Sequence, residues 1–226
     1  MAVLTTRTFH RRQNDGNDAE VVLSIFEPVQ KETNDWRCIF DFDPPLKPRN
    51  VAGRGMDWIQ AFTHSLEYAR LYFESQWSKT GHWQNMGHLG LPDSTREMPQ
   101  CEATELPNLE ATGEALLVQA TRDLSIPNES GGVRKVTLSL YSPFPTVDGS
   151  WKCAFSFDPI DAGSIRYGVG VDFIESFLDA LAAARRVFES MIPAGWTGSD
   201  DLFDCSDFPI KIGRAFQISR SSRKTP

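Results

Sequence analysis

The sequence predicts an α+β protein built as a tandem duplication of one small β-β-β-(β)-α unit. Residues 1–75 align with residues 116–190 without a gap, and roughly a third of the aligned positions are identical. In each copy an alternating aromatic segment predicts a β-strand, and apolar residues spaced three and four apart predict a helix packed across the sheet. We therefore expect two domains, over residues 1–115 and 116–226, in a pseudo-twofold arrangement.

Three strands are predicted at the start of each copy. In the first copy the first two strands are residues 3–9 and 20–27, and the third follows at residues 36–43. Pro28 stops the second strand, because proline has no amide hydrogen to donate to the ladder. In the third strand one face is aromatic apart from a cysteine, in both copies. These faces are Trp36, Cys38, Phe40 and Phe42, and Trp151, Cys153, Phe155 and Phe157. A short fourth strand is predicted at residues 51–56 and 165–171, where glycines indicate a bulge or a close approach of two backbones.

A helix follows the strands in each copy. Asp57 and Asp172 are predicted N-caps, and Gln60 and Glu175, three residues later, complete a capping box. Spacings of three and four place five apolar residues on one side of each helix, where we expect them to pack on the aromatic strand face. The two stripes are Ile59, Phe62, Leu66, Ala69 and Phe73, and Ile174, Phe177, Leu181, Ala184 and Phe188.

Composition limits the classes of function. Hydrophobic residues make up 40% of the 226 residues, which is enough for an ordinary core. The net charge of -7 disfavours nucleic-acid binding, because an acidic surface repels phosphates. The first residues do not resemble a signal peptide, and no apolar stretch is long enough to span a membrane. We therefore expect a cytoplasmic protein that binds neither nucleic acid nor membrane.

No group of residues predicts catalysis, a metal site or a cofactor. We expect Cys38 and Cys153 to be buried, reduced thiols, and the absence of a C-x-x-C pair gives a zinc site no support. His82 and His88 lie six apart in a loop, but the second copy has no matching pair, so we interpret them as surface residues. The glycines of residues 53–57 are better explained by a strand-to-helix turn than by a phosphate loop.

The two copies continue into unlike extensions. The second extension carries an acidic run, which predicts either a solvated loop or a docking surface for a basic protein. The residues of this candidate docking surface are Asp200, Asp201, Asp204 and Asp207.

The core motifs resemble an uncharacterised bacterial domain family. That family has a Trp-x-Cys-x-Phe strand followed by a Gly-x-Asp-x-x-Gln-Ala helix entry, here residues 36–40 and 55–61. The resemblance carries no activity, although small α+β domains of this kind look like immunity proteins of bacterial toxin systems. We therefore expect a non-catalytic binding protein, in its most specific form an acidic, immunity-like one. The alternative is an enzyme or small-molecule binder with its site between the two repeats.

Overall fold

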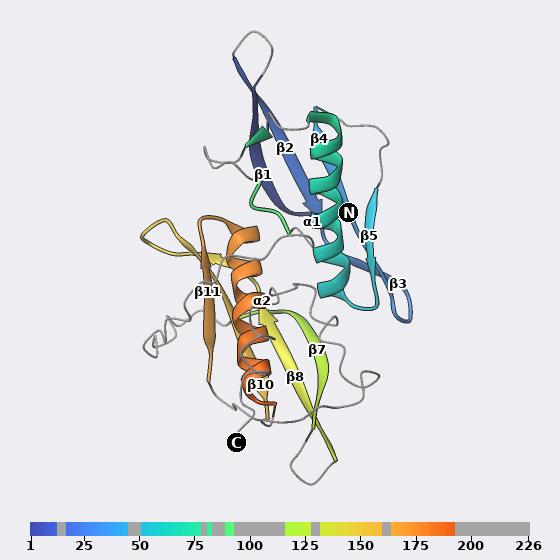
Figure 1. The fold of residues 1–226 in the computed structure, drawn as a ribbon, viewed down its shortest axis with the longest axis vertical. Helices are drawn as coiled ribbons and strands as arrows, with labels where there is room; N and C mark the ends of the chain where they lie inside the picture. The colour runs from blue at the N-terminus through green and yellow to red at the C-terminus, as the bar shows by residue number, and fades with distance from the viewer. Residues whose placement is uncertain are drawn as a thin grey trace, which may run out of the picture.

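Two antiparallel sheets, each covered on one face by a helix, form the protein (Figure 1). The computed structural model describes eight stretches of the chain, and all structural statements below refer to them. These are residues 1–12, 17–44, 51–77, 81–82, 89–92, 116–127, 132–159 and 164–192. The predicted boundary between residues 115 and 116 lies next to a stretch outside them, so the domain limits stay a prediction.

The first unit has the strand order β3-β4-β2-β1-β6, and β5 pairs with the other side of β4. Its elements are β1 (Val3–Arg12), β2 (Asp18–Phe26), β3 (Val29–Glu32), β4 (Asp35–Asp43), β5 (Ala52–Gly55), α1 (Trp58–Trp77) and β6 (Gly81–His82). The second unit has the order β11-β10-β8-β7, and β9 pairs with β10. Its elements are β7 (Val118–Pro127), β8 (Val133–Tyr141), β9 (Phe144–Pro145), β10 (Trp151–Asp158), β11 (Arg166–Gly170) and α2 (Phe173–Ser190).

The predicted fold class is confirmed, since residues 1–75 and 116–190 each form five strands and one helix in the same order. Even the cis peptide bonds repeat, at Asp43–Pro44 and Asp158–Pro159. The sequence patterns did not predict β3 and β9, which are short strands that resume after the proline ending β2 and β8. Residues 29–32 lack a periodic apolar pattern, because this strand is mostly exposed and is held by its pairing with β4.

Both helices begin directly after the predicted caps. The amide of Gln60 donates to the Asp57 carboxylate (2.8 Å), and the amide of Glu175 donates to that of Asp172 (2.8 Å). The reciprocal bonds also form, but their donors are the amides of Met56 and Val171, one residue before each cap. The capping boxes are therefore confirmed with this one shift in donor.

The glycines of β5 and β11 allow each helix to lie almost against the backbone of its sheet. A Cβ atom on Gly168 would overlap the main-chain nitrogen and Cα of Ala180 in α2. Gly53 faces the main chain of Ser65 in α1 in the same way. The predicted close approach of two backbones is confirmed, and it fixes the position of each helix on its sheet.

The helix stripes are buried as predicted, and their C-terminal rings, Phe73 and Phe188, pack on the aromatic strand face. Phe73 contacts Phe9 and Phe42, with ring centroids 5.0 and 6.1 Å apart. Phe62 and Phe177, by contrast, contact each other across the two units (5.0 Å). The stripe therefore has a second contact that was not predicted, because the first turns of both helices lie at the boundary between the units.

Candidate functional site

Aromatic rings and ion pairs from the two units meet at the boundary between them. The two helices run in opposite directions, with their first turns nearest to this boundary (Figure 1). Four rings from these turns pack together: Trp58 and Phe62 of α1 with Phe173 and Phe177 of α2. We call these four residues the aromatic junction. Trp58 and Phe173 are equivalent positions of the repeat, as are Phe62 and Phe177, so each unit contributes the same two positions.

Two ion pairs flank the aromatic junction, and each joins one unit to the other. Arg7 of β1 donates from Nε and Nη2 to the carboxylate of Asp172, at 2.7 and 2.6 Å. In the equivalent pair, Arg122 of β7 lies 2.8 Å from Asp57 through its Nε atom. The arginine side chains are only 1% and 7% exposed, while the aspartates are about a quarter exposed. Each unit thus contributes the arginine of one pair and the aspartate of the other. This is the arrangement of contacts in a dimer with twofold symmetry.

Each of these aspartates performs two tasks at once. The Asp57 carboxylate accepts from the amide of Gln60 and also receives the guanidinium of the other unit. A charged carboxylate at a helix N-terminus is favoured by the free amides of the first turn. The arginine neutralises this carboxylate, which lets the helix N-terminus lie at the boundary with the other unit.

One junction contact breaks the pseudosymmetry. Glu27 accepts from the indole Nε1 of Trp58 (2.9 Å) and from the side-chain amide of Gln119 (3.0 Å). Its equivalent in the second unit is Ser142, which has no carboxylate. Glu27 therefore links α1 to the first residues of β7 on one side of the junction only.

A short segment, residues 89–92, covers the Arg7 side of the junction. Nη1 of Arg7 donates to the carbonyl of Gly90 (2.7 Å), and Nε of Arg70 donates to that of Pro92 (2.8 Å). Leu89 and Leu91 are buried in the core. Both arginines thus hold main-chain carbonyls of this segment against the first unit.

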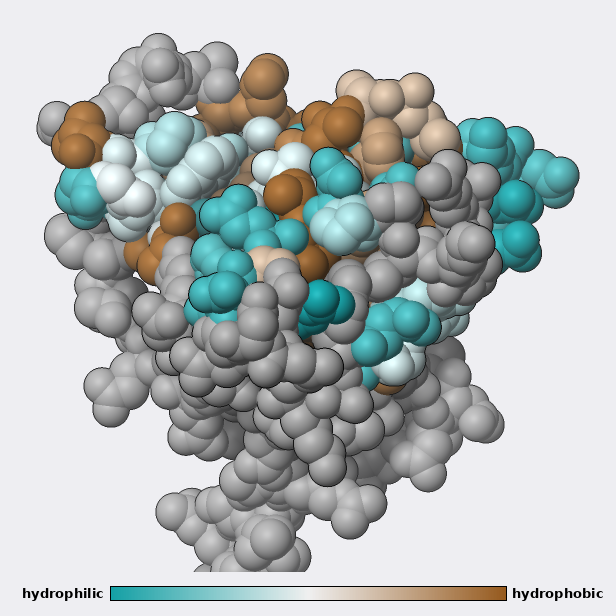
Figure 2. Space-filling model, turned by 90° about the horizontal axis from the view of Figure 1, so that it is seen from above, coloured by the Kyte–Doolittle hydropathy of each residue, from teal (hydrophilic) through white to brown (hydrophobic). Residues whose placement is uncertain are grey.

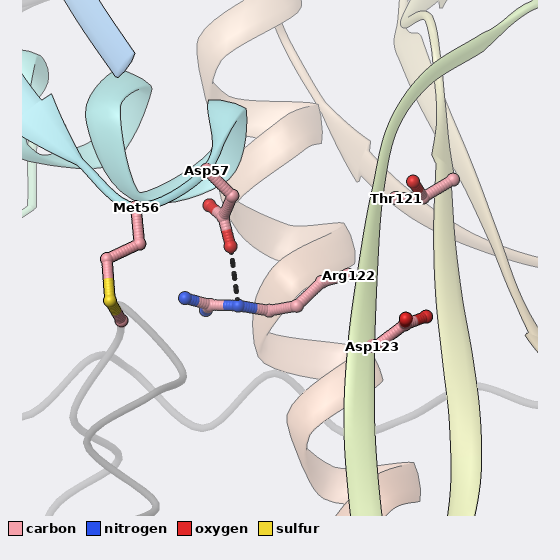
Figure 3. A pocket seen from close by; sticks show the side chains of 5 residues that line it. All are labelled: Met56, Asp57, Thr121, Arg122 and Asp123. Carbon is pink, nitrogen blue, oxygen red and sulfur yellow. Dashed lines mark ion pairs between the residues drawn. The ribbon is translucent and has the colours of Figure 1, made fainter. Parts of the chain in front are cut away.

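An open pocket of about 320 Å³ lies beside the Arg122 pair (Figure 3). Met56 and Asp57 line it from the entry to α1, and Thr121, Arg122 and Asp123 line it from β7. Figure 3 shows the Arg122 guanidinium directed at Asp57, while the side chains of Thr121 and Asp123, its neighbours on β7, point away from Asp57. Two of the three ionisable groups of the pocket are therefore paired with each other.

The two described cysteines are structural. Cys38 donates to the carbonyl of Phe26 (3.3 Å) and Cys153 to that of Tyr141 (3.4 Å). Burial raises the pKa of Cys38 to about 12 and also moves the pKa of Cys153 far above the ordinary thiol range. Both are free, buried thiols, as predicted. A thiol that stays protonated is a poor nucleophile, so neither cysteine suits covalent catalysis.

Other candidate residues divide between structural roles and positions outside the described stretches. His64 of α1 lies 2.6 Å from the carbonyl of Arg54 in β5 through Nδ1, so it helps to join the helix to this strand. His88 and the acidic run of Asp200, Asp201, Asp204 and Asp207 lie outside the described residues. Within the described stretches no group of three His, Cys, Asp or Glu residues is arranged to hold a metal ion. Nor does either described helix have the length and apolarity needed to cross a membrane.

Sequence reasoning missed Arg7 and Arg122. Both lie on the inward face of their strands, next to buried apolar residues such as Phe9 and Leu124. A charged residue at an inward position, identical in both copies, was the available signal. It indicates a buried partner, although not which one.

Comparison with known proteins identifies the family. A family model described as a domain of unknown function, DUF6968, matches residues 5–93 and 120–191. The chain belongs to the DUF6968 family. The two matched segments coincide with the two structural units, which confirms the suspected relationship to an uncharacterised domain family. No curated protein and no solved structure matches the chain.

Proposed function

We propose that this DUF6968 protein is a non-catalytic binding protein of the bacterial cytoplasm, and that its partner is a basic protein. One observation carries the proposal: the buried ionisable groups at the boundary between the units hold the units together. Arg7 pairs with Asp172, Arg122 pairs with Asp57, and both aspartates also cap helices. Groups engaged in this way are positioned for stability and not for proton transfer or nucleophilic attack.

The thiols support the same proposal. Cys38 and Cys153 are buried and reduced. Free thiols are typical of a reducing compartment, which agrees with a cytoplasmic location. Their raised pKa values also leave them without nucleophilic character.

Charge favours a basic partner. The net charge of the chain is -7. Complementary charge increases the rate of encounter and suppresses wrong partners. Asp200, Asp201, Asp204 and Asp207 concentrate four carboxylates in eight residues, so we propose this run as the docking surface. An acidic protein that binds a basic effector in this way would act like an immunity protein.

The competing hypothesis, an enzyme or small-molecule binder with its site between the repeats, has less support. Its natural place is the pocket beside Arg122, whose ionisable groups are Asp57, Arg122 and Asp123. Asp57 and Arg122 pair with each other, and Asp123 accepts a hydrogen bond from Thr137 (2.9 Å). Each ionisable group of this pocket therefore already has a partner within the fold.

The first step of the test is to capture the partner from the native host and to identify it. We expect a protein with an isoelectric point above about 9. Its affinity for the purified chain should fall steeply as salt is raised, because the complex depends on charge.

The second step replaces the four aspartates of the run with asparagine. We expect at least tenfold weaker binding, a flatter salt dependence and nearly unchanged stability. The matched control neutralises four exposed carboxylates elsewhere, namely Glu20, Glu32, Asp41 and Asp123, and should change affinity far less. A partner without basic character, or equal losses in both variants, would contradict the proposed docking surface.

A further inference from the structure

The outer face of the first sheet, opposite α1, carries a pocket that the boundary between the units does not involve. Its volume is about 280 Å³, and β3, β4, β5 and Met1 line it. Three cations surround it, Lys31, Arg37 and Arg54, and the lining also includes three half-buried apolar side chains, Val29, Ile39 and Ala52. We call it the cationic pocket. In Figure 1 its strands β3 and β5 lie at the right of the first unit.

The strand register places two positive charges directly opposite each other. Arg37 of β4 pairs with Val29 of β3 on one side and with Arg54 of β5 on the other. Like charges at directly opposite positions of neighbouring strands are destabilising. In the second unit the same register pairs Lys152 with Val169, which removes the repulsion. The first unit therefore keeps an unfavourable pair that the fold itself does not require.

These cations have few internal partners. Within the described stretches, the side chains of Lys31 and Arg54 make no hydrogen bond or ion pair, and the Nε of Arg37 is a buried donor without an acceptor. Nη2 of Arg37 donates to Asp35 (2.9 Å). The hydrogen bond from Arg37, together with the charges of Arg54 and Lys31, lowers the pKa of Asp35. One carboxylate thus faces three cations, in a protein whose overall charge is negative.

The second unit shows which shape fits this place. Where the first unit has Val29 and Ala52, the second has Phe144 and Tyr167, whose rings meet edge to face with centroids 6.4 Å apart. Lys152, the equivalent of Arg37, places its ammonium 5.9 Å from the centre of the Tyr167 ring. In the second unit, therefore, aromatic rings beneath a cation fill the space that is open in the first unit.

We propose that the cationic pocket of the first unit binds a small aromatic anion, a single ring that bears a carboxylate or phosphate group. The ring would rest on Ile39 and Ala52, in the place that Tyr167 fills in the second unit. The anionic group would receive charge-assisted hydrogen bonds from Arg37 and Arg54, whose guanidinium groups match planar carboxylates and phosphates. The volume suits one ring, since it lies just below the range for pockets that hold drug-sized ligands. This site does not depend on the function proposed above.

The test uses titration calorimetry on the full chain, with benzoate and phenyl phosphate as probes. We expect saturable binding with a dissociation constant of about 1 mM or tighter, which a probe of about nine non-hydrogen atoms can reach. Acetate and inorganic phosphate lack the ring, and benzylamine carries the wrong charge, so all three should bind at least about tenfold more weakly. If neither ring-bearing probe binds, or if the small ions bind equally well, the proposal is overturned.

Substitutions that give the first unit the residues found at equivalent positions of the second unit test the location of the site. Arg54→Val should weaken both aromatic probes about tenfold or more, because it removes a charged donor. It should leave the melting temperature equal or higher, because the repulsion with Arg37 is lost. Ala52→Tyr should abolish binding by filling the pocket. The control Arg134→Val removes the same charge from an exposed position of β8 and should leave affinity unchanged. Equal losses in Arg54→Val and Arg134→Val would show a nonspecific charge effect and refute the site.

Discussion

Removal of the Asp172 carboxylate is expected to be the most damaging single change at the junction. Asp172 accepts from Nε and Nη2 of Arg7 and from the amide of Glu175. Asp172→Ala therefore removes a helix cap, which costs about 0.5–2 kcal/mol. It also leaves the guanidinium of Arg7, only 1% exposed, without its counter-ion. Breaking a buried pair from one side costs about 3–5 kcal/mol, so we expect a total loss of roughly 4–6 kcal/mol.

Further variants separate the contribution of the helix cap to stability from that of the ion pair. Asp172→Asn keeps a good N-cap but loses the charge, so it should cost roughly 1–2 kcal/mol less than Asp172→Ala. Asp35→Asn breaks the more exposed pair with Arg37 and should destabilise the protein far less than Asp172→Asn. In a double-mutant cycle with Arg7→Met, the coupling energy between Arg7 and Asp172 should exceed about 1 kcal/mol.

The assay is equilibrium urea unfolding, followed by far-ultraviolet circular dichroism and by tryptophan fluorescence. Trp58, one of the six tryptophans of the chain, lies in the junction and contributes to the fluorescence signal. A loss below about 1 kcal/mol for Asp172→Ala, or a coupling energy near zero, would refute the assignment of Arg7 and Asp172 as a buried inter-unit pair.

Three further predictions test the packing and the thiols. Phe62→Ala and Phe177→Ala should each cost about 3–5 kcal/mol in urea unfolding, and losses below about 1 kcal/mol would show that neither ring is core. Gly168→Ala should lower the melting temperature measurably, because its Cβ would overlap the α2 backbone, so an unchanged value would contradict that contact. Because burial raises the pKa of Cys38 from about 9 to about 12, the contribution of this thiol to stability should be constant below pH 9 and fall between pH 9 and pH 12, by up to about 1.4 kcal/mol per pH unit. A Cys38→Ala variant should lack part of that fall. Alkylation of Cys38 and Cys153 should be slow at neutral pH, and rapid labelling of the native protein would contradict their burial.

Local patterns were sufficient to predict most elements of each unit. The alternation of Trp36, Cys38, Phe40 and Phe42 predicted β4, because side chains two apart share one face of a strand. Asp57 predicted the start of α1, because a cap must bond the free amides of the first turn. These features depend on neighbours within a few residues, so they can be recognised in a single sequence.

Contacts between distant segments could not be predicted in the same way. Arg7 and Asp172 are 165 residues apart, and nothing in the local sequence of either specifies the other. The contact of Phe62 with the other unit was missed for the same reason: an apolar stripe predicts burial but not every surface that covers it. The cationic pocket was also missed, because Lys31, Arg37 and Arg54 come together only through the register of three strands.

The surface offered less information than the core. Figure 2, which views the molecule from the end of the first unit, shows hydrophobic and hydrophilic residues interspersed over the described part of that face. A partner surface is therefore not recognisable there from hydropathy alone. Comparison of equivalent positions in the two units was more informative, because it separates residues that the shared fold needs from residues that only one unit has, such as Arg54.

Nuclear Overhauser contacts between Trp58 and Phe177 in the intact protein test the fused pseudo-dimer most directly. The ring centroids of these residues, from different units, lie 5.6 Å apart, and those of Trp58 and Phe62, within α1, lie 5.0 Å apart. We expect cross-peaks between the Trp58 indole protons and both phenylalanine rings, with comparable intensity. Cross-peaks to Phe62 without any to Phe177 would show that the two units do not meet through their helix N-termini.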